Sequence, residues 1–216
     1  MSLEATLDRL HSRAVSNTWL QFFTAVVRVL LALAFIPSGL TKVLGNPFTT
    51  LPETTSVGFF FAGFFQAQGY YRFVGISQLT ASALLLFRST TTLGAALYLP
   101  IIVNIFVITI SVGFQGTPVV TGLMLLANIY LICWDYDRWK GVLPGFSRNA
   151  EIVKSRHVPG STIGLLLLSA AIGLSSAFAG NLARLGRGGS VAMALLSLAA
   201  GAAVGFTALW RHIRAR

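Results

Sequence analysis

Residues 26–42 read Val26-Val-Arg-Val-Leu-Leu-Ala-Leu-Ala-Phe-Ile-Pro-Ser-Gly-Leu-Thr-Lys42, an apolar run that carries one arginine and ends in a lysine. An arginine at the centre of a membrane helix costs about 2.5–3.5 kcal/mol on insertion scales, so it is rarely accidental. The Pro37-Ser-Gly triplet predicts that this helix ends near residue 38. We therefore expect the group that satisfies Arg28 to lie near the functional site.

The whole chain is too apolar for a soluble domain. Its 216 residues are 55% hydrophobic and 10% charged, whereas soluble domains carry about 25% charged residues. The net charge of +10 comes from basic residues that flank apolar spans rather than from a patch with interleaved aromatics. Such residues are typical of topology signals that face anionic lipids, so the expected partner is the lipid membrane and not nucleic acid.

The cysteine and histidine content excludes several kinds of redox centre. Cys133 is the single cysteine, so the chain has no CxxC pair and no thiolate iron–sulfur set. The three histidines all fall outside the apolar spans, which argues against a haem held by two intramembrane imidazoles. We expect no metal site and no covalently bound cofactor.

Six apolar spans are predicted, each close to the roughly 20 residues that cross a bilayer. They lie near residues 19–38, 70–87, 93–113, 117–134, 161–180 and 190–210. With the N-terminus inside, eleven basic residues face the cytoplasm (Arg9, Arg13, Arg88, Arg138, Lys140, Arg148, Lys154, Arg156, Arg211, Arg214 and Arg216) and four face outwards (Lys42, Arg72, Arg184 and Arg187). This bias predicts that both termini are cytoplasmic, in a membrane of the bacterial inner type. The four tryptophans agree, because all of them fall at the same cytoplasmic interface.

The expected fold is an all-α membrane protein in four segments. Residues 1–18 form an amphipathic segment, either an interfacial anchor or a solvated lead-in, and residues 19–140 form a four-helix transmembrane bundle. A basic cytoplasmic linker covers 141–160, and 161–216 add two further transmembrane helices as a hairpin. Its Gly201-Ala-Ala-Val-Gly205 pattern suits close helix packing, so we expect a protein partner or a homo-oligomer through this hairpin.

The first outer loop contains a phenylalanine-rich stretch. Its apolar residues follow a helical stripe that is too short to cross the membrane: Val57, Phe60, Phe61, Phe64 and Phe65. We expect a re-entrant or interfacial helix here. In the functional interpretation Phe60, Phe61 and Phe64 form a lid over a lipophilic pocket, whereas in the alternative the helix simply rests on the membrane.

Polar side chains recur within the first four predicted spans: Arg28, Gln78, Asn104 and Asn128. Polar groups in hydrocarbon face the bundle interior and pair with one another, so these four are expected to converge. Glu53 is the one acid predicted on the outer side. Three partners for Arg28 stay open: Glu53 folded inwards, neutral oxygens of the protein, or a ligand. Lys42 is expected to attract an anion or a partner at the outer face.

Several stretches within residues 24–140 occur together in one known family. They are Arg28 followed by Pro37-Ser-Gly-Leu-Thr-Lys42, Gly75-Ile-Ser-Gln78-Leu, Leu84-Leu-Leu-Phe-Arg88 into Leu93-Gly94, and Ile129-Tyr-Leu-Ile-Cys-Trp-Asp-Tyr-Asp137. In order and spacing they resemble the DoxX family of small membrane proteins. The resemblance implies a four-helix membrane bundle and, for some members, association with quinone-linked oxidation of sulfur compounds or with oxidoreductase complexes. Other members are implicated in stress resistance or assembly, and the hairpin after residue 150 departs from the four-span pattern.

Two functions follow as hypotheses. In the first, the protein is a membrane subunit associated with quinone-linked redox chemistry, and it holds a quinone or another lipophile non-covalently in an outer-leaflet polar pocket. Its ligand-binding residues would be Arg28, Lys42, Glu53, Gln78, Asn104 and Asn128. If enzymatic, it would belong to a larger quinone-dependent oxidoreductase complex. In the second, the chain is a non-catalytic assembly or interaction protein, and the polar cluster serves only helix register.

Overall fold

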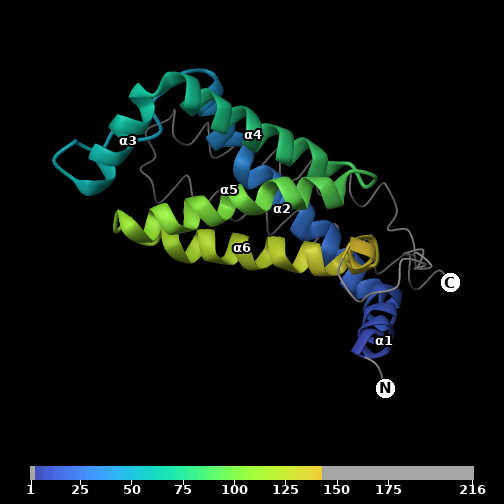
Figure 1. Cartoon of the computed structure of the whole chain (residues 1–216). Helices are drawn as coiled ribbons and strands as arrows, with labels where there is room; N and C mark the ends of the chain where they lie inside the picture. Colours follow the sequence, from blue (N-terminus) through green and yellow to red (C-terminus); the bar gives the residue numbers. More distant parts are fainter. Residues whose placement is uncertain (1–2, 143–216) are drawn as a thin grey trace.

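The computed structural model describes residues 3–142, and this part of the chain is helical throughout, without strands. Its elements are α1 (Leu3–Ser16), α2 (Thr18–Val43), α3 (Ser56–Gln66), α4 (Gln68–Leu86), α5 (Thr91–Ser111), α6 (Thr117–Trp134), α7 (Tyr136–Trp139) and a 3-10 turn (Lys140–Val142). Helices α2, α4, α5 and α6 form a bundle, with α3 at one end and α1 and α7 at the other (Figure 1). The predicted linker beyond 142 and the hairpin at 161–216 lie outside the described residues.

Three of the described helices are long and apolar enough to cross a membrane, namely α2, α5 and α6. This agrees with a membrane protein by length and composition. The sequence predicts a fourth span at 70–87, and α4 occupies that position in the bundle, but it is more polar than the other three. Polar residues such as Ser77, Gln78 and Thr80 interrupt its apolar surface.

The first span is longer than the sequence predicts. Pro37 was expected to end the helix near residue 38, but α2 continues through it to Val43. A proline removes one backbone hydrogen bond, and membrane helices tolerate this where neighbouring groups satisfy the freed carbonyls. The consequence is that Lys42 lies in the last turn of α2 instead of in the outer loop.

Local signals start the helices where the sequence places them. The side chain of Asn17 accepts hydrogen bonds from the backbone N–H groups of Trp19 (2.9 Å) and Leu20 (3.4 Å), which begins α2. Thr55 likewise accepts from the N–H of Gly58 at 3.0 Å and begins α3. These caps satisfy donors that would otherwise have no intrahelical partner. The short helix predicted in the first outer loop is therefore present as α3.

The core lies between the four bundle helices. The buried residues of the core are Val27, Leu31, Ala32, Phe35, Ala81, Leu85, Ala95, Tyr98, Ile102 and Leu131. At its centre the rings of Phe35 and Tyr98 stack with centroids 3.8 Å apart, and the Tyr98 hydroxyl donates to the carbonyl of Leu31 at 3.1 Å. The ring contact and the hydrogen bond both join α2 to α5.

Glycines allow the closest helix approach, between α2 and α4. A Cβ added at Gly75 would lie 2.7 Å from Lys42 Cβ and 2.8 Å from the carbonyl oxygen of Gly39. Real side chains do not approach this closely, so the two helices can pack here only because position 75 has no side chain. Gly94 has the same role between α5 and α4, where an added Cβ would lie 2.7 Å from Leu85 N.

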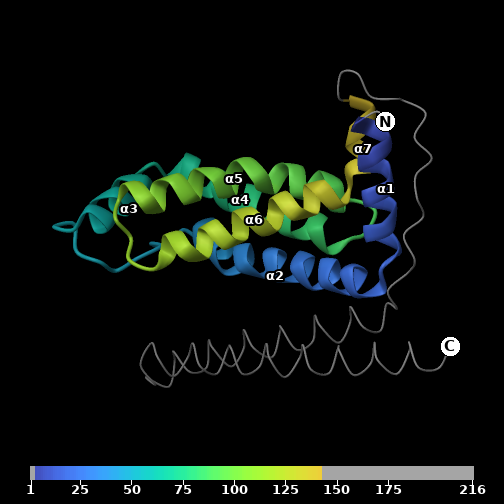
Figure 2. The same ribbon diagram turned by 90° about the horizontal axis from the view of Figure 1, so that it is seen from below.

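Helix α1 lies across the end of the bundle, beside α7 (Figure 2). His11 Nε2 lies 2.9 Å from the Trp134 carbonyl oxygen, and His11 Nδ1 lies 3.3 Å from a carboxylate oxygen of Asp137. Lys140 donates to Asp8 at 2.9 Å. The amphipathic N-terminal segment is thus tied to the bundle by polar contacts of its own, which a purely solvated lead-in would lack.

Replacing Asp8 with asparagine should speed hydrogen exchange of the α1 amides by about two- to fivefold at neutral pH, because an ion pair whose carboxylate is exposed to water contributes only ~0.2–1 kcal/mol even though Lys140 itself is buried. The hydrogen bond to Asp8 raises the pKa of Lys140 above its ordinary value of 10.5. The stabilisation is therefore complete below pH 10.5 and is lost as the pH rises through the raised pKa. Above that pKa the α1 amides of the variant and the wild type should exchange at equal rates. A difference that persists there would contradict the role of the Asp8–Lys140 ion pair.

Candidate functional site

Arg28 is bound by backbone carbonyls at the end of α4. Its Nε and Nη2 donate to the carbonyl oxygen of Leu85 at 3.1 and 2.9 Å, and Nη2 also donates to Leu86 at 3.2 Å. The last carbonyls of a helix have no intrahelical partner and carry the negative end of the helix dipole. Of the three partners considered for Arg28, neutral oxygens of the protein are the ones it contacts.

Arg28, Gln78, Asn104 and Asn128, the four polar residues expected to meet inside the bundle, do not converge. Gln78 is fully buried and its side-chain oxygen accepts from the Ser38 hydroxyl at 3.3 Å. Asn128 is also fully buried, and its amide donates to the carbonyl of Ala95 at 3.1 Å. Asn104 is exposed on the outer side of α5. The expected meeting of Arg28 with Gln78 and Asn104 is therefore corrected, because each side chain finds its own surroundings.

The physical reason lies in helix ends and helix rotation. Arg28 lies level with the C-terminal end of α4, where backbone carbonyls lack an intrahelical partner. Gln78 lies about two turns before that end. A guanidinium that reaches several free carbonyls has no need of a distant amide. The rotation of α5 then directs Asn104 away from both.

Lys42 is a charged group that the fold buries at the α3 end of the bundle, with only 4% of its surface exposed. Its Nζ donates to the Ser38 carbonyl at 3.1 Å and to the Ser38 hydroxyl at 2.6 Å. The ring centroids of Phe48 and Tyr71 lie 4.7 and 5.9 Å from Nζ. Among the described residues no carboxylate forms an ion pair with Lys42. Lys42 was expected to attract an anion or a partner at the outer face, but its ammonium group is buried beside the rings of Phe48 and Tyr71.

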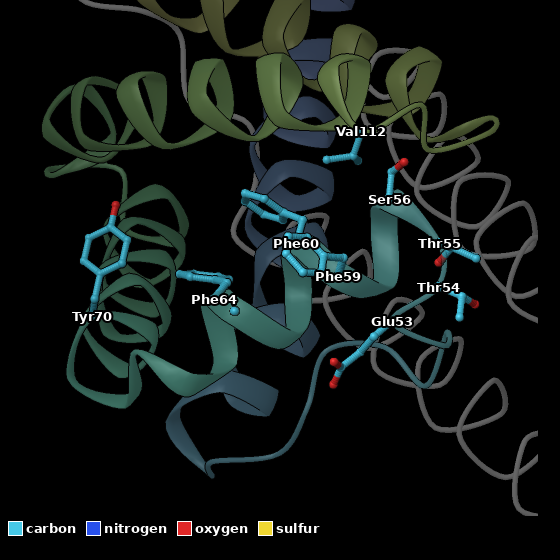
Figure 3. Close-up of a pocket in the computed structure, with 10 residues that line it drawn as sticks. Glu53, Thr54, Thr55, Ser56, Phe59, Phe60, Phe64, Tyr70 and Val112 are labelled. Atoms are coloured by element: carbon cyan, nitrogen blue, oxygen red, sulfur yellow. The ribbon is translucent and has the colours of Figure 1, made fainter.

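An open groove of about 810 Å³ lies over α3 (Figure 3). Its lining residues are Glu53, Thr54, Thr55, Ser56, Phe59, Phe60, Gly63, Phe64, Tyr70 and Val112. Figure 3 shows the loop before α3 on one side, the phenyl rings of α3 in the middle and Tyr70 of α4 on the other. Glu53, Phe60 and Phe64 are thus brought together, whereas Arg28, Gln78, Asn104 and Asn128 do not line this groove.

Phe61 does not line the groove. Its ring packs against Phe48, with centroids 4.7 Å apart, and against Phe114 at 6.3 Å. It therefore belongs to the layer beneath the groove, between α3 and the bundle. One aromatic layer separates the groove from Lys42, because Phe64 contacts Tyr71 at 5.0 Å and Tyr71 in turn faces Lys42.

Sequence reasoning missed the hydroxyl groups of the groove and its far wall. Thr54, Ser56 and Tyr70 line it, and their hydroxyls form no hydrogen bond with another residue in the described part of the chain. The run Thr54-Thr55-Ser56 just before the phenylalanine stripe was a usable signal. No sequence signal pointed to Val112, because its position in the groove depends on how the turn between α5 and α6 packs against α3.

The groove brings three kinds of chemical group together. It combines aromatic rings, free hydroxyl donors and one carboxylate, and Glu53 forms no ion pair with a described residue. Within residues 3–142 no three His, Cys, Asp or Glu side chains are grouped as they would be to hold a metal ion. The lining therefore offers both apolar ring surface and polar groups at the surface of the protein.

The comparisons with known proteins give one relative. No family model matches the chain, and no solved structure is detectably similar to it. The protein described as "Uncharacterized protein YwoB" from Bacillus subtilis (strain 168) is 33% identical over 142 residues, which cover 62% of this chain and 87% of the relative. At this identity, over most of the relative's length, the chain belongs to the same family as YwoB.

Proposed function

We propose that this protein is a membrane subunit associated with quinone-linked redox chemistry, and that it holds a quinone-like amphiphile in the groove over α3. The observation that carries the proposal is the groove itself, with phenyl rings next to free hydroxyls and a carboxylate. The resemblance of residues 24–140 to the DoxX family supports it. The site differs from the pocket first expected, because Arg28 takes no part.

The chemistry of the lining matches such a ligand. The rings of Phe60 and Phe64 offer stacking surface to a planar head, and aromatic pairs add about 0.5–1.5 kcal/mol beyond burial. The hydroxyls of Thr54, Ser56 and Tyr70 are donors for a quinone carbonyl. The Glu53 carboxylate is an acceptor for a quinol hydroxyl. Electrons would come from a partner protein.

The proposal includes a topology. We place α4 as a fourth membrane-crossing helix, both termini in the cytoplasm, and α3 with its groove at the outer interface. In a Cys133→Ser background, a cysteine at Thr54 should then react with an impermeant maleimide in intact cells, whereas a cysteine at Ser12 should react only after lysis. The reverse pattern would overturn the orientation.

The binding test uses purified protein in lipid nanodiscs titrated with decylubiquinone, a quinone with a short tail. Phe60→Ala combined with Phe64→Ala should weaken binding about 10- to 100-fold, because two ring contacts and their buried area are lost. Phe87→Ala is the matched control, since that ring is 67% exposed at the opposite end of α4. Binding that is absent in the wild type, or equal in all three proteins, would refute the proposed site.

A further inference from the structure

Asn104 occupies an unusual position for a polar residue in a membrane helix. It is exposed on α5, an apolar helix long enough to cross the membrane, about 20 Å along the axis from Thr91. The exposed residues around it are Pro100, Val103, Val107 and Ile110. Its side chain forms no hydrogen bond with any residue in the described part of the chain. An amide is thus presented outwards from an apolar face, seven residues before the end of α5.

The other amides of the bundle helices behave differently. Gln21, Gln78 and Asn128 are all buried, and each forms at least one hydrogen bond within the chain, although Asn128 Oδ1 has no partner. Gln68, at the start of α4, is half-buried and donates to the carbonyl of Phe65 at 2.7 Å. An amide that faces acyl chains would lose its bonds to water without replacement, which hydrocarbon makes costly. Polar side chains on the outside of a membrane helix therefore mark contacts with another helix.

We infer that the α5 face around Asn104 is a contact between two copies of this chain in the membrane, in which the two Asn104 side chains hydrogen-bond to each other. This interaction surface is independent of the groove over α3. It also differs from the oligomer expected through the C-terminal hairpin.

A second copy is the occupant that fits Asn104 best. Copies inserted in the same orientation are related by rotation about the membrane normal, so Asn104 lies at the same depth in both. A carboxamide is its own complement, since its oxygen accepts and its nitrogen donates, and a two-fold axis makes both bonds reciprocal. The apolar neighbours Val103 and Val107 are stiff at χ1 and lose little side-chain freedom in such a contact.

The competing occupant is the predicted hairpin of the same chain. The polar residues near the centres of its two predicted spans are Ser169 and Ser197. A serine hydroxyl has one donor hydrogen, so it satisfies fewer of the hydrogen-bonding groups of an amide than a second asparagine does. The comparison favours the second copy, and the hairpin becomes an outcome of the test.

The first experiment measures Förster transfer between donor- and acceptor-labelled copies of the full chain in liposomes, across a range of protein-to-lipid ratios. The Asn104→Leu variant should raise the dissociation constant of the dimer about 5- to 100-fold, while Asn104→Gln, which keeps the amide, should retain most of the affinity. Leu123→Ala, on the exposed face of α6, is the matched control and should behave as wild type. Equal transfer in Asn104→Leu and wild type would overturn the inference.

The second experiment does not depend on removing the amide. In a Cys133→Ser background, Val107→Cys should form an intermolecular disulfide on mild oxidation in membranes, because the position lies one turn from Asn104 on the same exposed face. Leu123→Cys should not. Equal cross-linking of Val107→Cys and Leu123→Cys would overturn the proposed contact. An intramolecular disulfide in the double variant Asn104→Cys/Ser197→Cys would also overturn it, because the hairpin of the same chain would then cover this face of α5.

Discussion

Replacing Arg28 with methionine is expected to lower the free energy of unfolding by about 2–4 kcal/mol, because hydrogen bonds from a charged donor are worth about 1.5–3 kcal/mol each and act here as a coupled set. The variant leaves the carbonyls of Leu85 and Leu86 without their donor. It also removes the polar contact between α2 and the end of α4. Thermal unfolding of the purified protein in detergent, followed by circular dichroism, measures the loss.

Two controls separate this structural role from the alternatives first considered. Arg28→Lys keeps a charge but not the forked geometry, so its stability should be intermediate. Glu53→Gln should change stability by less than about 0.5 kcal/mol, because Glu53 lines the groove and forms no ion pair with Arg28. The two changes should be additive in the double variant. A double variant that costs clearly less than the sum would restore Glu53 as the partner of Arg28.

Replacing Gly75 with alanine is the second change with a large expected effect. The new methyl group would meet Lys42 Cβ, the Gly39 carbonyl and Val43 Cγ2, at 2.7, 2.8 and 3.1 Å, and two of these three atoms cannot move without moving the backbone of α2. Overpacking of this kind costs about 1–3 kcal/mol. The melting temperature should fall, and the displaced α2 should carry Ser38 and Lys42 away from Gln78.

The matched control lies in the same helix. A Cβ added at Gly69 meets no atom within 4 Å, so Gly69→Ala should be neutral or stabilising by up to ~1 kcal/mol through helix propensity. Comparing the two variants isolates the contact between α2 and α4 from the general effect of glycine on a helix. Equal melting temperatures for Gly75→Ala and wild type would contradict the close approach.

These two changes act on opposite ends of one helix pair. Arg28 joins α2 to the end of α4, and the Gly39–Gly75 contact joins them near the other end, beside Lys42. Beside the Gly39–Gly75 contact, the polar chain Lys42–Ser38–Gln78 crosses from one helix to the other. The buried ammonium group of Lys42 is therefore held by a helix pair that is fixed near both ends. The rings of Tyr71 and Phe64 lie between this ammonium group and the groove.

The positions of the helices could be predicted because their apolar runs and breaks are local properties. The predicted spans 70–87, 93–113 and 117–134 correspond closely to α4, α5 and α6. The short phenylalanine-rich helix was also predicted, as α3. The first span was too short in the prediction, because a proline weakens a helix locally while packing against α4 decides whether the helix continues.

The partners of the polar residues could not be predicted, and the reason differs from residue to residue. Arg28 binds backbone carbonyls, which every residue possesses, so no pattern of side chains points to them. The outward direction of Asn104 depends on the rotation of α5, and that helix is apolar on its buried and exposed faces alike. A uniformly apolar helix carries no periodic signal for its facing side.

The sequence by itself determined that residues 3–142 are helical, that the chain is apolar enough for a membrane, and which residues carry charge along the described helices. Only the tertiary structure decided that Lys42 is buried and that Arg28 donates hydrogen bonds to the carbonyls at the end of α4. It also decided that Glu53, Phe60, Phe64 and Tyr70 line one groove. Helix formation depends on neighbours along the chain, whereas enclosure and convergence depend on how separate helices rotate and end against one another.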